Sequence, residues 1–83
     1  MVSKERARSA IYKALREEFN LTVTCDADAW RAVRDIDSRD LMDLVMEIEY
    51  DLDASIDTDQ LGADFLDGED TEVALDLLVK SLY

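Results

Sequence analysis

The segment from residue 38 to residue 52 carries the most regular apolar stripe in this chain, and such a stripe favours a helix with one buried face. At about 100° per residue, five aliphatic side chains fall within an arc of roughly 100° on a helical wheel: Leu41, Leu44, Val45, Ile48 and Leu52. We therefore predict a helix over roughly Ser38 to Leu52 with this stripe in the core. Met46 and Tyr50 fall on the opposite side of the wheel, where they would be exposed.

Two further helices follow from the same spacing. Apolar residues recur at intervals of three and four from Ser3 to Phe19, which predicts a helix capped by Ser3 and closed by Asn20. Residues 21–24 alternate in polarity but have no second strand to pair with, so we expect an extended loop. The last helix should start at Asp70 or Thr71, and we expect its bundle-facing residues to be Val73, Ala74, Leu77, Leu78 and also Leu82.

The intervening segments are less regular. In the segment from Asp26 to Arg34 we predict a short helical turn capped by Asp26, with Trp30 and Val33 facing inward. Residues 53–70 are acidic, and a short helix near Thr58 to Leu66 is expected there. Its apolar anchors and turn residues would be Ile56, Leu61, Phe65 and Leu66 with Gly62 and Gly68. Together these elements predict an all-α fold, a small four-helix bundle with a short third helix, in one domain over residues 1–83.

Charge and composition exclude several function classes. The 83 residues carry a formal net charge of -12 and no histidine, so the chain should repel nucleic acid and anionic membranes and attract basic protein surfaces. We expect a monomer that binds neither. Cys25 is the only cysteine, which excludes an internal disulfide and favours a reducing, cytoplasmic location. The charged amino-terminal segment lacks the apolar run of a signal peptide.

The residue types in the chain and their spacing also argue against catalysis and metal binding. Without histidine, Ser-His-Asp and Cys-His mechanisms are impossible. An EF-hand loop needs glycine at position six and glutamate at twelve. Counting from Asp51 puts Ile56 and Gly62 there, and counting from Asp57 puts Gly68 at twelve. We therefore expect neither an enzyme nor a metal site.

Ser38 is the residue on which the functional prediction depends. The pair Asp37-Ser38 opens the predicted 38–52 helix, and one interpretation is that it only caps the first turn. However, the segment from Asp37 to Glu49 resembles the attachment-site helix of the acyl carrier proteins, in which Asp-Ser is followed by mixed acidic and apolar residues. Trp30 also stands eight residues before Ser38, where that family has a large aromatic. The resemblance implies a bundle of acyl-carrier type.

The resemblance also implies a function. A phosphopantetheinyl transferase would attach 4'-phosphopantetheine from coenzyme A to Ser38, with Asp37 flanking the site, and the arm would carry acyl groups as thioesters. The pathway would be fatty-acid, polyketide or related biosynthesis. Acyl-transferring or ketosynthase-type enzymes with basic docking patches would contact the exposed residues of the 38–52 helix: Arg39, Asp40, Asp43, Met46, Glu47 and Glu49. Leu44, Val45 and Ile48 would belong to the core and could also line a pocket for acyl chains.

Some features depart from the family pattern. Arg39 replaces the leucine or methionine that usually follows the serine, and Asp35 stands where glycine is frequent, which suggests a specialised carrier. An aminoacyl or peptidyl carrier is a related alternative. From a different class, an unmodified acidic helical adaptor or nucleic-acid mimic would bind a basic protein surface directly. Cys25 is interpreted as a small apolar residue that is buried or half-buried.

Overall fold

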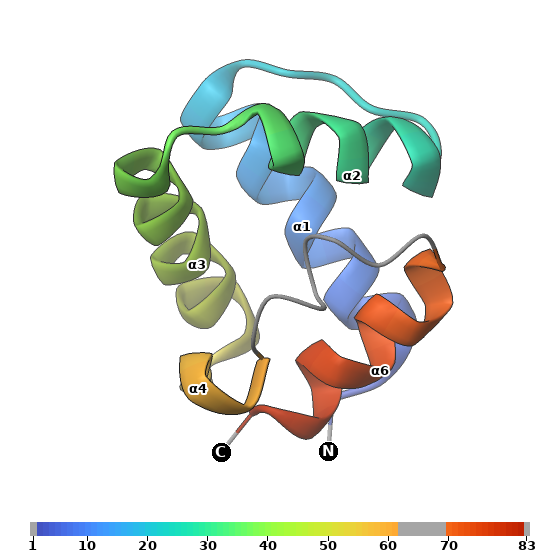
Figure 1. The fold of residues 1–83 in the computed structure, drawn as a ribbon, viewed down its shortest axis with the longest axis vertical. Coiled ribbons are helices and arrows are strands. Elements are labelled where there is room, and N and C mark those ends of the chain that lie inside the picture. The colour runs from blue at the N-terminus through green and yellow to red at the C-terminus, as the bar shows by residue number, and fades with distance from the viewer. Residues whose placement is uncertain (1, 62–69, 83) are drawn as a thin grey trace.

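Helix α1 lies at the centre of the fold, and α2, α3 and α6 pack against it (Figure 1). The computed structural model describes residues 2–61 and 70–82, and at Ser38, Gln60 and Leu61 it describes the backbone only. The helices are α1 (Lys4–Phe19), α2 (Asp26–Asp35), α3 (Ser38–Leu52), α4 (Thr58–Leu61) and α6 (Thr71–Lys80). Within these described ranges the only β-type pairing is a single bridge between Ile56 and Leu82. The predicted all-α class is confirmed.

Both ends of α1 are closed by the residues that the sequence indicates. The Ser3 hydroxyl accepts a hydrogen bond from the Arg6 backbone N–H at 3.1 Å. Asn20 adopts the left-handed conformation with φ of 56°, and its N–H bonds to the Arg16 and Leu15 carbonyls. Because asparagine tolerates this conformation better than most residues, it ends the helix at little cost. The predicted first helix is confirmed.

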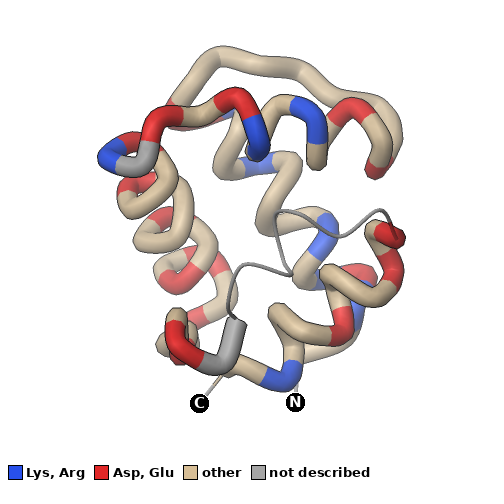
Figure 2. The backbone as a smooth tube through the Cα atoms, viewed as in Figure 1, with Lys and Arg blue, Asp and Glu red and all other residues tan. Residues whose placement is uncertain are grey.

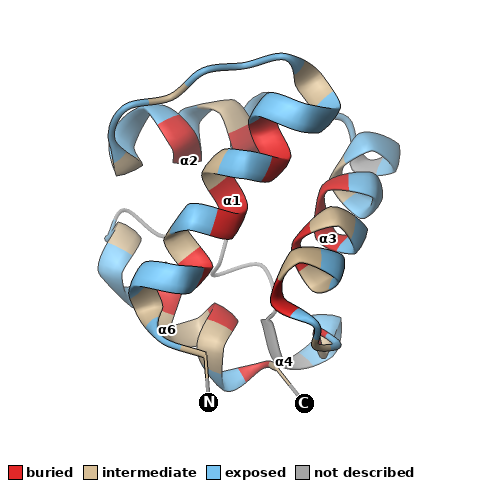
Figure 3. Ribbon diagram, turned by 180° about the vertical axis from the view of Figure 1, so that it is seen from behind, coloured by how far each residue is buried: buried red, intermediate tan, exposed pale blue. Residues whose placement is uncertain are grey.

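The core is one cluster to which α1, α2, α3 and α6 all contribute, and the buried faces of these helices point toward one another (Figure 3). Its largest fully buried side chains include Trp30, Ile11, Leu44 and Ile48. Three alanines of α1, at positions 7, 10 and 14, are also buried there, and their small side chains allow close approach of the neighbouring helices. Burial of large apolar side chains is the main stabilising term in such a domain.

The rotation predicted for α3 is confirmed. Leu44, Val45, Ile48 and Leu52 are buried, and Leu41 is half-buried against the same cluster. Asp53 ends α3 in the left-handed conformation with φ of 52°, and its N–H bonds to the Glu49 and Tyr50 carbonyls. The opposite face of α3 is therefore turned away from the core.

Helix α2 is longer than the sequence predicted. Ten residues, Asp26–Asp35, are helical, and the N-cap is Cys25 rather than Asp26. The prediction that Asp26 caps this helix is wrong because its carboxylate binds side chains of α1 instead. Trp30 and Val33 are buried as expected. Only residues 36 and 37 separate α2 from α3, so the C-terminal end of α2 lies next to the start of α3 in the chain.

Helix α6 shows one error in the predicted buried face. Its N-cap is Asp70, whose carboxylate accepts the Glu72 N–H at 2.9 Å, as expected. However, Val73 is 52% exposed, whereas Leu75, which the sequence prediction left out, is fully buried. The buried set is Ala74, Leu75, Leu78 and Ser81, a spacing of one, three and three residues that matches a single helical face.

The structure describes only the first part of the short helix that was predicted after residue 57. Helix α4 covers its first residues, while Phe65, Leu66 and both predicted turn glycines lie outside the described residues, as does the Leu61 side chain. Ile56 is buried as predicted. The Asp57 N–H donates to the Ser81 carbonyl at 2.7 Å, which joins the segment after α3 to the end of α6.

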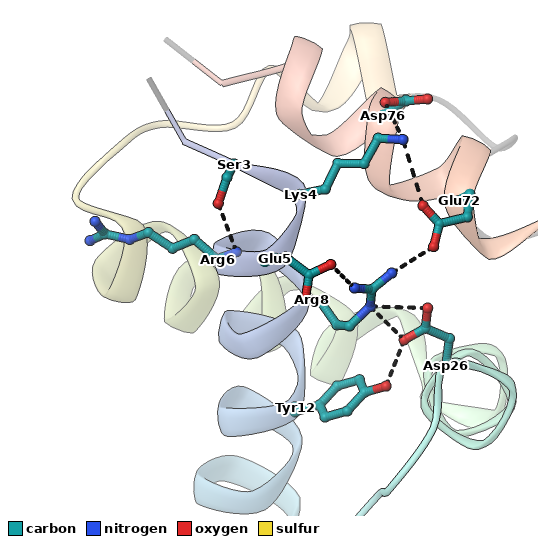
Figure 4. Close-up of polar contacts among 9 residues, drawn as sticks. All are labelled: Ser3, Lys4, Glu5, Arg6, Arg8, Tyr12, Asp26, Glu72 and Asp76. Carbon is teal, nitrogen blue, oxygen red and sulfur yellow. Dashed lines mark hydrogen bonds and ion pairs between the residues drawn. The ribbon is translucent and has the colours of Figure 1, made fainter.

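A polar network centred on Arg8 links α1 to α2 and α6 (Figure 4). The Arg8 guanidinium donates to Asp26 at 3.0 and 3.1 Å, to Glu72 at 2.6 Å and to Glu5. The Tyr12 hydroxyl donates to Asp26 Oδ1 at 2.6 Å, the same oxygen that accepts the 3.0 Å bond from Arg8. Burial, together with this hydrogen bond to a carboxylate, raises the pKa of Tyr12 to about 12. The network therefore fixes how the start of α2 sits against α1.

Candidate functional site

Ser38 is the first residue of α3, and the residue before it caps the helix. Asp37 Oδ1 accepts a hydrogen bond from the Arg39 backbone N–H at 3.0 Å, and the Asp37 carbonyl accepts from the Leu41 N–H at 2.8 Å. The predicted helix start is confirmed. A cap at Asp37 satisfies a free amide of the first turn, so the helix does not need Ser38 in that role. The Ser38 side chain itself lies outside the described residues.

The residues around this position are open to solvent. Asp37, Arg39 and Asp40 are all exposed. The N-terminal end of a helix carries a partial positive charge and favours a phosphate group. The surroundings of position 38 therefore suit a bulky phosphodiester substituent, although two neighbouring carboxylates oppose its negative charge.

The outward face of α3 is strongly acidic. This helix contains five acidic residues and one basic residue, Arg39, whereas α1 contains three acidic and five basic residues. Figure 2 shows the acidic positions distributed along α3 and the basic positions along α1. Among the residues predicted to contact partners, Asp43 and Met46 are exposed like Arg39 and Asp40, and Glu47 is half-buried. These predicted residues therefore line a surface that can attract a basic partner.

Glu49 has a structural role that the sequence prediction missed. It is half-buried, and its Oε2 accepts a hydrogen bond from the Ile56 backbone N–H at 2.7 Å. A carboxylate bonded to an amide of its own chain is less available to a partner than the solvent-facing acid that we predicted. This bond instead holds the segment that follows α3.

Three large apolar side chains form a stripe on the exposed side of α3. Met42, Met46 and Tyr50 are spaced four residues apart and are 54%, 60% and 87% exposed. The exposed positions of Met46 and Tyr50 agree with the prediction from the sequence, whereas Met42, which the four-residue spacing indicates equally, was not predicted. An apolar stripe bordered by carboxylates is typical of a protein-binding face. We call these three exposed residues the α3 stripe, as distinct from the buried apolar face of the same helix.

Carboxylates crowd together where the end of α1 meets α3. A hydrogen bond with Glu47 raises the pKa of Glu18 above its ordinary value, and the nearby charges of Asp43 and Glu17 add to the rise. Like charges at this spacing destabilise the folded state at neutral pH. A cationic group placed against this region would relieve the repulsion.

A groove of about 680 Å³ lies beside the start of α3. Its apolar lining comes from the end of α1, the following loop, α2 and the residue after α2: Phe19, Leu21, Ala32 and Ile36. Its acidic lining comes from α2, the residue before α3 and the first turn of α3: Asp28, Asp35, Asp37 and Asp40. Arg31 is the single cation among its described lining residues. Two of these aspartates, Asp37 and Asp40, lie one residue before and two residues after Ser38 in the sequence, so the groove opens next to the predicted attachment position.

Cys25, metal binding and membrane crossing were also considered in the sequence predictions. Cys25 is exposed, so its interpretation as a buried or half-buried apolar residue is wrong. It precedes the first residue of α2, and its side chain makes no capping hydrogen bond. Over the described part of the chain, no three acidic or cysteine side chains converge to hold a metal ion, and no helix combines the length and apolarity needed to cross a membrane.

Comparison with protein-family models, with curated proteins and with solved structures found no match to this chain.

Proposed function

We propose that this protein is an acyl carrier that receives 4'-phosphopantetheine on Ser38 and presents acyl thioesters to other enzymes of fatty-acid, polyketide or related biosynthesis. In the loading reaction, the serine oxygen bonds to the phosphorus that carries pantetheine in coenzyme A, and adenosine bisphosphate leaves. The attached group supplies a thiol that can hold an acyl chain. The protein supplies the attachment point and the recognition surface.

The observation that carries this proposal is the division of roles between Asp37 and Ser38. The sequence left open whether this pair serves only as a helix cap. Asp37 makes the capping bond to the Arg39 N–H, so capping does not explain a serine at the next position. The residues on both sides of position 38, Asp37 and Arg39, are exposed, and attachment of a large group requires such open surroundings.

The α3 surface supports the second half of the proposal. A carrier must be recognised by several enzymes in turn, so it needs a face that binds reversibly. Exposed acids around the α3 stripe would steer basic partners by long-range attraction. Methionine side chains are adaptable apolar contacts, which suits a face that must fit more than one partner.

Mass spectrometry after incubation with coenzyme A, magnesium and a promiscuous phosphopantetheinyl transferase tests the proposal. We expect the intact protein to gain the mass of one phosphopantetheine. Ser38→Ala should abolish the gain. Ser9→Ala and Ser55→Ala, which replace exposed serines elsewhere, are the matched controls and should load like the unmodified sequence.

A folded chain that gains no mass would contradict the carrier function. The acidic face of α3 would then favour the alternative, an unmodified adaptor that binds a basic protein surface. Loading of the Ser38→Ala variant would also contradict the proposal, because the group would then be attached elsewhere.

A further inference from the structure

The groove of about 680 Å³ beside the start of α3 is not yet used by the proposed function. Small-molecule sites in proteins have volumes of about 300–1,000 Å³, and this groove lies within that range. Its lining comes from three helices and the loop after α1. It lies apart from the α3 stripe, because none of the three stripe residues lines it.

The groove is positioned to receive a group tethered at Ser38. Asp37 and Asp40, which both line it, lie one residue before and two residues after the serine. A group attached at position 38 would therefore begin at the edge of the groove. Tethering gives such a group a high effective concentration at a nearby site, so weak contacts suffice to hold it.

The lining of the groove matches the chemistry of a pantetheine arm. That arm has two amide N–H groups and one hydroxyl group that donate hydrogen bonds, and the four aspartates offer acceptors for them. The apolar side chains of Leu21, Ala32 and Ile36 offer a surface for the carbon skeleton and for an attached acyl chain. A carboxylate on the acyl chain would be repelled by the aspartates.

We propose that this groove holds the pantetheine arm and an uncharged acyl chain carried on it. This inference rests on the proposed attachment at Ser38 and adds to it the place where the cargo lies and the class of cargo that fits. Uncharged acyl chains fit this lining, whereas chains ending in a carboxylate are repelled by its aspartates.

Nuclear magnetic resonance of the ¹⁵N-labelled protein tests this inference on three forms: unloaded, loaded with pantetheine and loaded with a hexanoyl group. We expect the largest amide shift changes at Leu21, Thr22, Ala32 and Ile36. A succinyl group, which ends in a carboxylate, should give markedly smaller changes at these residues than the hexanoyl group.

Two substitutions separate the groove from other effects. Ala32→Phe fills the groove and should remove the hexanoyl-dependent shifts while loading continues. Ala27→Phe places the same side chain at an exposed position of α2 outside the groove and should leave them unchanged. Leu21→Gln, at an exposed loop position, should weaken the shifts without a large change in the core.

The outcomes distinguish this inference from the function on which it rests. Failure of the unmodified sequence to load overturns the proposed function and this inference with it. Successful loading with shift changes confined to residues 37–40 means that the arm stays in solvent and overturns this inference alone. Changes centred on buried Leu44 and Leu78 place the chain inside the bundle and overturn it equally, as do equal effects of succinyl and hexanoyl groups.

Discussion

Replacing Leu44 with alanine should cost far more stability than replacing Met46 with alanine, although the two residues are only two positions apart in α3. Leu44 is 1% exposed, and truncating a buried leucine to alanine costs about 2–5 kcal/mol. A chain of 83 residues has an unfolding free energy of about 4–12 kcal/mol at typical values per residue. Met46 is 60% exposed, and substitutions at such sites usually change stability by less than about 0.5 kcal/mol.

Urea unfolding and thermal unfolding, both followed by far-ultraviolet circular dichroism, measure the free energy of unfolding and the Tm of the two variants. Each kcal/mol corresponds to about 4–8 °C in Tm for a domain of this size, so Leu44→Ala should lower Tm by at least about 8 °C. Met46→Ala should lie within a few degrees of the unmodified protein. Equal losses in the two variants would refute the rotation of α3, and with it the exposed face that we propose for partner binding.

Three further predictions test other parts of the structure. In α6, Leu75→Ala should destabilise by about 2–5 kcal/mol and Val73→Ala by much less, and the reverse order in urea unfolding would contradict the described face of this helix. Tyr12→Phe should cost about 1 kcal/mol at pH 7 because it removes the bond to Asp26, and unmodified protein should lose this contribution as pH rises from 10 toward about 12; an equally stable variant would show that the bond contributes nothing. Because the folded state raises the pKa of Glu18, its charge opposes folding above its ordinary pKa, so Glu18→Gln should raise Tm at pH 7 and have little effect below pH 4 (about the ordinary pKa of glutamate); a lower Tm at pH 7 would contradict the repulsion.

Local spacing in the sequence predicted α1 and α3 well because both helices show a clear three-and-four periodicity and recognisable caps. The same signal failed in α6, where apolar residues are nearly continuous from Val73 to Val79. In such a run several helical faces look equally apolar, and contact with α1 decides which one is buried. That decision depends on packing between distant parts of the chain.

Polar side chains were harder to place than apolar ones. Asp26 suits a helix cap by its residue type, but Arg8, which is 18 positions earlier, holds its carboxylate. Glu49 suits an exposed acid on a docking face, but the amide of Ile56 takes one of its oxygens. Both partners are brought near only by the tertiary fold. The candidate attachment position itself depended on local sequence alone, so the start of α3 at Ser38 could be predicted.

Two features at the C-terminal end of α3 lower the stability of the fold. Asp53 takes a left-handed backbone conformation that glycine adopts without steric cost. It also places a carboxylate at the negative end of the helix dipole, and no basic residue occupies the last turn. Exchange for glycine would relieve both penalties at a site remote in sequence from Ser38. Thermostable versions of this carrier candidate are therefore accessible without altering either the proposed attachment position or the groove.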